Sequence, residues 1–347
     1  MCKLELSKNN KKLTRLFSKG IWLSILITIS TLSAQEKSIS LDDINGGTFR
    51  PEYLSALRSM NNGKEYSIYN YDRKSKTSTI DVYDYKTGEK VKTLLNSTDI
   101  EEIDYIISYQ FSDDETKLLL ATKLKQIYRR SSVGIYYVYD LKLKKLTLVS
   151  DNQIQEPTFN GDSSKLAYGF NNNLYVKDLI SGETKQLTSD GQINRIINGI
   201  ADWVYEEEFS VVRAFDWNIS GDKIAFIRFD ETEVPEFLMD IMGNELYPTQ
   251  QVFKYPKAGE KNAEVSLHIY DLKRDQISQV DLSGFNNYYI PRIKWTKDSS
   301  LLSVQLLNRP QNKLDLILVD VSNKNATSLL HQESDDAYVS VNDDLTF

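Results

Sequence analysis

The 347-residue sequence has one cysteine, two histidines and no excess of basic residues, with a formal net charge of −7. The only cysteine is Cys2, so the rest of the chain can form no disulfide and no Cys-based metal site. A net negative charge argues against nucleic acid as a partner, because that requires a basic surface. No Gly-rich phosphate loop is present, and no His, Asp or Glu group has metal-ligand spacing, so neither a cofactor nor a metal is predicted.

The first 34 residues have the order of a secretory signal peptide. Basic residues from Lys3 to Lys19 precede an apolar run, 21–32, and the small residues Ser33 and Ala34 follow it. The apolar run is shorter than the roughly 20 residues that span a bilayer. The sequence therefore predicts a signal peptide over 1–34, a mature domain over 35–347, and a secreted or periplasmic protein; an N-terminal membrane anchor is the alternative.

Two short patterns alternate through the mature chain, which is rich in tyrosine and poor in helical periodicity. One is an aromatic residue, a polar turn and an apolar strand; the other is a strand that closes on Asp. The first occurs at 111–120, 159–168, 217–226 and 295–302, and in weaker form at 60–66. The second occurs at 80–85, 136–141, 174–179, 267–272 and 316–321.

Together the patterns describe two hairpins, or four strands, that repeat every 40 to 55 residues. This repeat is typical of the blades of a β-propeller, and five copies in register favour it over a β-sandwich. The predicted fold class is all-β, with about five blades. The acidic run 113–115 occupies a turn of the repeat, where turn formation is favoured over weak calcium binding.

The repeat is interrupted between Asp178 and Asp271, where the extra residues fall at 199–209 and 229–262. Loops of more than about 15 residues in compact domains are often functional. The first insertion contains three consecutive carboxylates, Glu206, Glu207 and Glu208, among large aromatics. Such a run is either a solvated acidic turn or a place for an incoming positive charge.

Residues 202–209 (DWVYEEEF), 229–235 (FDETEVP) and 255–259 (YPKAG) resemble segments of the dipeptidyl peptidase IV family. The resemblance extends from about Ile39 to Phe347. It implies a propeller that covers an α/β-hydrolase domain, in an enzyme that removes N-terminal dipeptides with proline or alanine in second position. The resemblance implies that 202–209 is a short helix in which Glu207 and Glu208 bind the free ammonium of the substrate. Glu206 precedes this pair and is less expected than they are to contact the substrate.

The resemblance implies two further features. An arginine that grips the substrate backbone near its amino end corresponds to Arg129, although a one-residue shift of register would select Arg130. The excursion over 229–262 is similar to an arm that takes part in dimer formation, so a homodimer is expected. A C-terminal hydrolase domain and peptides with a free N-terminus are the other expected partners.

The sequence departs from the family in its chemistry. A serine hydrolase needs a G-x-S-x-G nucleophile elbow with an acid and a histidine, and the sequence contains no G-x-S-x-G motif. His268 is predicted in a strand and His331 in a polar turn, neither with a serine partner. Residues 338–347 are predicted to open a sixth blade. The chain alone is therefore expected to be inactive; the alternatives are the propeller of a tripeptidyl peptidase and a non-catalytic binding module.

Overall fold

The computed structural model describes residues 38–51 and 57–347. The chain divides into two compact units, Met1–Leu54 and Ser55–Phe347. In the first, helix α2 (Leu41–Gly46) starts at a capping box formed by Ser40 and Asp43. The predicted signal peptide lies outside the described residues. Of the helices in the described residues, none has the length and apolar character needed to cross a membrane.

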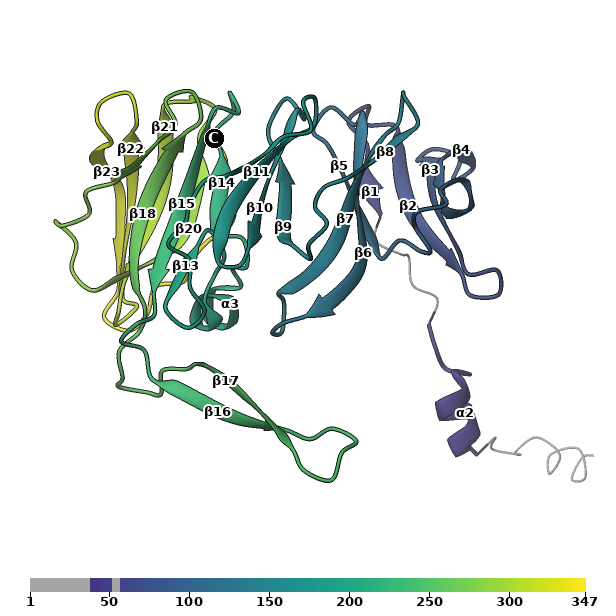
Figure 1. The fold of residues 1–347 in the computed structure, drawn as a ribbon, viewed down its shortest axis with the longest axis horizontal. Coiled ribbons are helices and arrows are strands. Elements are labelled where there is room, and N and C mark those ends of the chain that lie inside the picture. Colours follow the sequence, from purple (N-terminus) through teal and green to yellow (C-terminus); the bar gives the residue numbers. More distant parts are fainter. Residues whose placement is uncertain (1–37, 52–56) are drawn as a thin grey trace, which may run out of the picture. The chain divides into compact units, whose positions relative to one another are not determined.

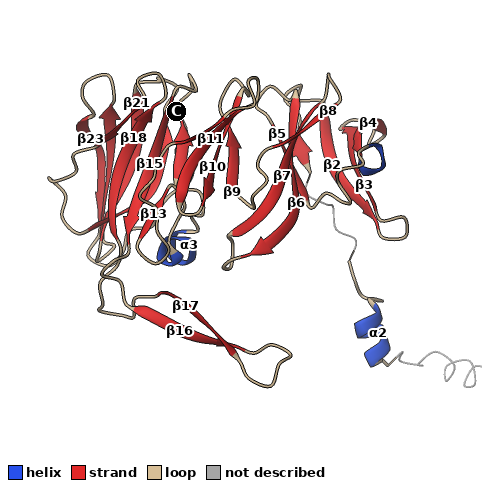
Figure 2. Cartoon of the chain, in the orientation of Figure 1, coloured by secondary structure: helices blue, strands red, loops and turns tan. Residues whose placement is uncertain are grey.

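Apart from one two-stranded hairpin, the described residues 57–347 of the second unit contain five antiparallel sheets that follow one another in chain order (Figures 1 and 2). Each has four strands, except the fourth, which has five. The first sheet comprises β1 (Arg58–Ser59), β2 (Glu65–Asp72), β3 (Thr77–Asp84) and β4 (Lys90–Asn96), which the 3₁₀ helix η1 (Ser97–Asp99) follows. The second comprises β5 (Ser108–Phe111), β6 (Lys117–Gln126), β7 (Ser132–Asp140) and β8 (Lys145–Leu148).

The remaining sheets repeat this plan. The third comprises β9 (Gln155–Phe159), β10 (Lys165–Phe170), β11 (Asn173–Asp178) and β12 (Thr184–Gln186). The fourth comprises β13 (Ile196–Asn198), β14 (Phe215–Trp217), β15 (Lys223–Asp230), β18 (Glu264–Asp271) and β19 (Gln276–Gln279). The fifth comprises β20 (Tyr288–Trp295), β21 (Leu301–Asn308), β22 (Lys313–Asp320) and β23 (Ala326–Ser334).

The Asp that closes each third strand has a structural role. In β3, Asp84 Oδ1 accepts hydrogen bonds from the backbone N–H groups of Lys86 and Thr87 at 2.8 and 2.9 Å. The same pair of bonds recurs at Asp140, Asp178, Asp271 and Asp320. An Asp side chain bonded two and three residues ahead fixes a tight turn, so this residue type ends the strand and starts the hairpin.

The hydrophobic core consists of four clusters, each between two consecutive sheets. Ile80 and Leu118 belong to the cluster between the first and second sheets, and Leu119 and Leu166 to the next. The other two clusters join the third sheet to the fourth and the fourth to the fifth. The inner strands β6, β10 and β15 belong to sheets that have a cluster on each face, which explains why each of them contains a nearly continuous apolar run. Face-to-face four-stranded sheets agree with the predicted propeller-type all-β fold.

Both predicted insertions leave the fourth sheet. Helix α3 (Trp203–Phe209) lies between β13 and β14. A hairpin of β16 (Glu236–Ile241) and β17 (Thr249–Lys254) lies between β15 and β18 and forms the arm, residues 229–262 (Figure 1).

Two expectations about the C-terminal part are wrong. Residues 338–347 contain no strand. Val339 is buried against the fifth sheet, Asp343 pairs with Arg292, and the Asn342 carbonyl accepts a hydrogen bond from Gln305. A strand needs a hydrogen-bonding neighbour, and these side-chain contacts supply none. His331 lies in β23 opposite Leu316, not in a turn, since β23 extends to Ser334.

Candidate functional site

The loop that carries α3 is closed at its base. The Ala214 N–H donates to the Gly199 carbonyl, and the Ala201 N–H to the Val212 carbonyl, both at 2.9 Å. Gly199 has φ +71°, and a Cβ there would lie 2.5 Å from a methyl carbon of Leu174. Backbone conformation and space thus both require glycine, and α3 returns to its sheet at a fixed position.

Local chemistry sets the ends of α3. Asp202 Oδ1 accepts a hydrogen bond from the Tyr205 N–H at 2.9 Å and caps the helix N-terminus. Ser210, in the left-handed conformation with φ 57°, ends it. Consecutive helical residues are about 100° apart, so the three carboxylates face different directions. Glu206 is 2% exposed, Glu207 is partly buried and Glu208 is exposed.

Glu206 joins α3 to the loop between β6 and β7. Its Oε1 accepts hydrogen bonds from the backbone N–H groups of Arg130 and Ser131, at 2.6 and 2.9 Å. Bonds to an ionised acceptor are stronger than neutral ones. The same loop is closed by the Ile127 N–H, which donates to the Ser131 carbonyl at 2.9 Å. The first glutamate of the triplet therefore fixes the loop that carries Arg129.

Arg129 and Glu207 form an ion pair across this junction. Arg129 Nη2 lies 2.9 Å from Glu207 Oε1, with the two side chains 70% and 24% exposed. Such an exposed pair contributes little to stability, about 0–1 kcal/mol. It does bring together two of the three residues predicted from sequence, which are 78 positions apart in the chain.

Glu208, the next residue of α3, lies near enough to the fifth sheet for its charge to act on Tyr289 in β20. Within the described residues its carboxylate has no hydrogen bond or ion pair. Burial raises the pKa of Tyr289, and the negative charge of Glu208 adds to this effect. We refer to Arg129, Glu207 and Glu208 together as the amine site.

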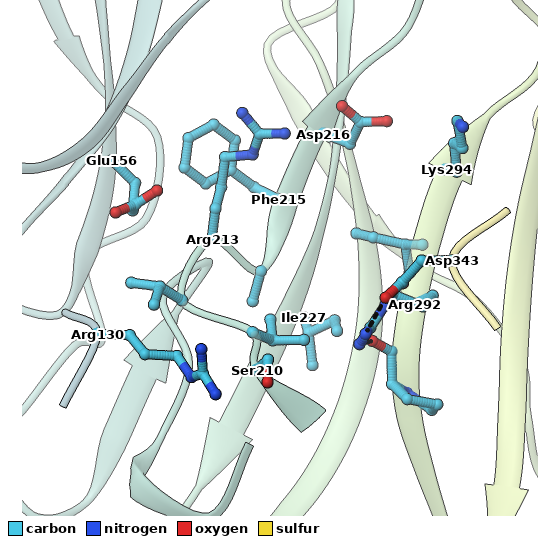
Figure 3. A pocket seen from close by; sticks show the side chains of 15 residues that line it. Arg130, Glu156, Ser210, Arg213, Phe215, Asp216, Ile227, Arg292, Lys294 and Asp343 are labelled. Carbon is cyan, nitrogen blue, oxygen red and sulfur yellow. Dashed lines mark hydrogen bonds and ion pairs between the residues drawn. The ribbon is translucent and has the colours of Figure 1, made fainter. Parts of the chain in front are cut away.

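A cavity of about 640 Å³ is lined in part by residues that lie close in the sequence to the amine site (Figure 3). Its lining includes Ser210, which ends α3, and Arg130, which follows Arg129; the three residues of the amine site are not in the lining. Arg213 and Glu156 also line it, and burial raises the pKa of Glu156 while Arg213 opposes that shift. On the far wall Arg292 pairs with Asp343. The lining therefore mixes polar and apolar side chains and carries both signs of charge.

Two buried carboxyl groups lie near the N-terminus of α3, and one of them is its capping residue. Asp202 is 4% exposed, and burial raises its pKa to about 7. Glu231, in the first residues of the arm, is 6% exposed; burial and the nearby Asp202 carboxylate raise its pKa to about 8, while the Lys254 ammonium lowers it. We call Asp202 and Glu231 the buried acid pair. Sequence reasoning missed this pair, because nothing in the pattern indicates that the two segments meet.

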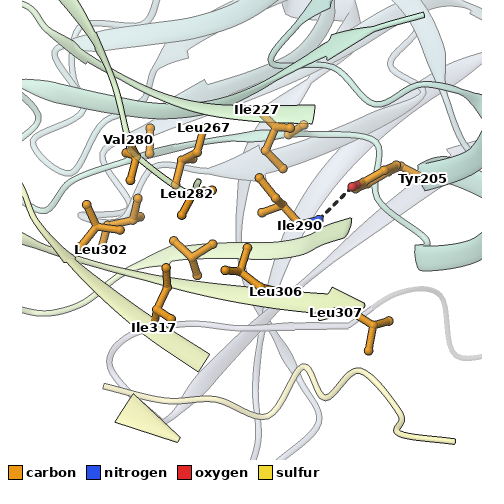
Figure 4. Packing of buried hydrophobic residues seen from close by; sticks show 14 of the residues in the cluster. Tyr205, Ile227, Leu267, Val280, Leu282, Ile290, Leu302, Leu306, Leu307 and Ile317 are labelled. Atoms are coloured by element: carbon orange, nitrogen blue, oxygen red, sulfur yellow. Dashed lines mark hydrogen bonds between the residues drawn. The ribbon is translucent and has the colours of Figure 1, made fainter. Parts of the chain in front are cut away.

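Tyr205 anchors α3 to the fifth sheet. Its hydroxyl accepts a hydrogen bond from the Ile290 N–H at 2.8 Å (Figure 4). Its ring packs against Phe209 and Phe229, with centroids 5.2 and 4.9 Å away. The helix is thus attached to the second sheet through Glu206 and to the fifth through Tyr205.

The other residues singled out in the sequence have structural surroundings. His268 stacks on Phe226 at 5.3 Å, and burial lowers its pKa to about 4, so it is neutral at neutral pH. Asp114 accepts hydrogen bonds from Ser112 and Thr116, as a turn residue does. Among the described residues, no group of three or more His, Cys, Asp or Glu side chains is arranged to hold a metal ion.

Comparison with known proteins decides the family. A family model described as "Dipeptidyl peptidase IV (DPP IV) N-terminal region" matches residues 112–347, more than half of the chain. The chain belongs to this family. In a crystal structure of Porphyromonas gingivalis dipeptidyl peptidase 4, 34% of aligned residues are identical and the TM-score is 0.81, with 88% of this chain and 43% of that chain covered.

Similarity to individual curated proteins supports the same family. A probable dipeptidyl-aminopeptidase B of Chaetomium globosum is 31% identical over 321 residues, covering 82% of this chain and 34% of the relative. The inactive dipeptidyl peptidase 10 of Mus musculus is 28% identical over 340 residues, covering 93% and 42%. The chain therefore spans between a third and a half of the length of these relatives.

Proposed function

We propose that this chain is the substrate-selecting propeller portion of a secreted or periplasmic serine exopeptidase that releases N-terminal dipeptides ending in proline or alanine. In this proposal Glu207 and Glu208 bind the ammonium of the peptide N-terminus, and Arg129 binds a backbone carbonyl near it. The Ser, Asp and His of catalysis belong to an α/β-hydrolase domain outside these 347 residues.

The observation that carries the proposal is the unequal pairing of the two carboxylates. Glu207 is held by Arg129 at 2.9 Å, whereas Glu208 has no partner among the described residues. An ammonium placed between them would meet two charged acceptors, one already oriented by the ion pair. A carbonyl oxygen near Arg129 would receive a guanidinium N–H. Because the peptide is held by its charged N-terminus, this arrangement favours cleavage a few residues from that end.

Substitution of each glutamate tests the amine site. In the enzyme that contains the hydrolase domain, Glu207→Ala or Glu208→Ala should lower kcat/KM for a Gly-Pro substrate roughly a hundredfold. This factor corresponds to a loss of about 3 kcal/mol in binding free energy, because a bound ammonium loses one charged acceptor. Asp281→Ala, a change at an exposed carboxylate remote in sequence, is the matched control. A change within about twofold for both glutamates, no larger than for an ordinary surface substitution, would remove them from the mechanism.

A non-catalytic binding module is a second candidate, because a similar relative is named an inactive dipeptidyl peptidase. Reading the coding sequence beyond Phe347 separates the two: an in-frame domain with G-x-S-x-G supports the enzyme. A tripeptidyl peptidase would share the same amine site, and comparing release of dipeptides and tripeptides from one peptide decides between them.

The arm suggests a second copy of the chain as partner. Its hairpin exposes Met242, Leu246 and Tyr247, at 79%, 88% and 78%. Exposed apolar side chains of this size are often covered by a partner, and the resemblance to the family's dimerisation arm favours a homodimer. Sedimentation velocity of the protein with and without Leu246→Asp measures this directly; a monomer in both cases would exclude it. Cell fractionation tests the proposed export.

A further inference from the structure

The base of the arm contacts the two segments that carry the amine site, the loop with Arg129 and helix α3. Phe253, near the end of β17, is 7% exposed, and its ring centroid lies 6.0 Å from that of Tyr128, the residue before Arg129. Two positions along, the Tyr255 ring lies 4.4 Å from that of Trp203, the first residue of α3. We call Phe253 and Tyr255 the arm base.

The arm base is itself fixed in place. Phe237 on β16 packs against both members, with centroids 5.9 and 5.4 Å away. The backbone N–H of Tyr255 donates to the Pro235 carbonyl at 3.0 Å. Between them, Lys254 is partly buried; its ammonium donates to the Val234 carbonyl at 2.7 Å and lies 3.9 Å from Glu236 Oε1, and its charge lowers the pKa of Glu231. The end of β17 is thus the buried part of an otherwise exposed hairpin.

We propose that Phe253 and Tyr255 are positioning residues, which set the distance between Arg129 and the carboxylates of α3 and thereby the affinity for a peptide ammonium. The inference rests on the proposed function of the amine site. Arg129 is 70% exposed, so its own side chain does not fix its place. The loop that carries it is held by Glu206 on one side and by the contact of Tyr128 with Phe253 on the other.

The arm base acts by geometry. Small displacements of groups that bind a substrate weaken binding strongly, because the contacts depend on distances near 3 Å. Removing the Phe253 ring leaves Tyr128 without its neighbour, and removing the Tyr255 ring does the same for Trp203. In each case one half of the amine site is free to shift relative to the other.

The test measures peptide affinity in variants of the arm. The probes are Gly-Pro-amide and N-acetyl-Gly-Pro-amide, and the protein is the 347-residue chain with 5-fluorotryptophan, observed by ¹⁹F NMR. Phe253→Ala and Tyr255→Ala should each raise the Kd for the free-amine probe about tenfold. Phe253→Leu and Tyr255→Phe, which keep the packing, should restore affinity. Val252→Ala, a change at a 42% exposed neighbour, is the matched control and should leave Kd within about twofold.

The spectrum separates the possible failures. In Phe253→Ala and Tyr255→Ala the Trp203 resonance should move even without probe, whereas Trp217 and Trp295, in β14 and β20, should stay in place and report an intact fold. A parent chain that binds neither probe overturns the proposed function. Equal Kd values for Phe253→Ala and the parent overturn the positioning role, as does amide hydrogen exchange at 127–131 that is the same in Phe253→Ala and Val252→Ala.

Discussion

Glu206 has the same side chain as its two neighbours in α3 but a different role, because it points inward. It holds two consecutive backbone N–H groups of the loop that carries Arg129. Glu206→Ala should leave both groups without their acceptor, at a cost of about 2–3 kcal/mol. Amide hydrogen exchange at Arg130 and Ser131 should accelerate, and affinity for a free-amine peptide should fall.

Glu206→Gln is the matched variant, because it keeps an acceptor oxygen and loses the charge. Protection of the two amides should therefore fall in the order parent, Gln, Ala. If both amides exchange at the parent rate in the Ala variant, another contact holds the loop and Glu206 has no positioning role.

The buried acid pair gives the fold a pH dependence. Burial raises the pKa of Asp202 from 3.8 to about 7 and that of Glu231 from 4.5 to about 8. At a pH between the unfolded and the folded pKa values, both carboxyl groups have lost their protons in the unfolded chain and keep them in the folded chain. The unfolded state then binds fewer protons than the folded state, so the free energy of unfolding falls as pH rises from about 4 to about 8. The stabilisation by these two protonated carboxyl groups is fully present only below about pH 4.

Thermal unfolding at about pH 5 and about pH 8 measures this effect. The melting temperature should be lower at the higher pH, and the difference should shrink in Glu231→Gln, which cannot ionise. Asp281→Asn, at an exposed carboxylate, should leave the difference as in the parent. A Glu231→Gln variant with the full parental difference would show that Glu231 is ionised in the folded protein at both pH values.

At the scale of elements, the sheets were predictable and several of their contacts were not. The aromatic–turn–strand pattern and the closing Asp are local signals, since the Asp side chain bonds two and three residues ahead. By contrast, Glu206 meets Arg130 from 76 residues away, and Tyr205 meets Ile290 from 85. No local pattern encodes such partners, so the sequence named the residues of the amine site by family resemblance and missed the contacts that hold them.

The hairpin predicted over residues 338–347 is an error of the opposite kind, since a local pattern is present but the strands do not form. Residues 338–347 have an acceptable strand pattern, yet they form none, because local preference for a strand is realised only beside a strand to pair with. Their side chains and carbonyls bond to β20 and β21 instead, for example the Leu345 carbonyl to Lys294. A sequence pattern thus predicts the residues suited to a strand, and the neighbouring element decides whether the strand exists.

At the scale of the molecule, binding and catalysis are expected to be separable. The 347 residues contain the proposed amine site but no G-x-S-x-G motif, and the stacking of His268 on Phe226 and the place of His331 in β23 leave neither histidine beside a nucleophile elbow. The purified chain should therefore release no chromophore from Gly-Pro-p-nitroanilide above the blank, while still binding Gly-Pro-amide through its free amine. A peptidase that hydrolyses this substrate provides the positive control. Turnover by the chain that a serine-directed phosphonate abolishes would contradict the prediction, because it would require a nucleophile within these residues.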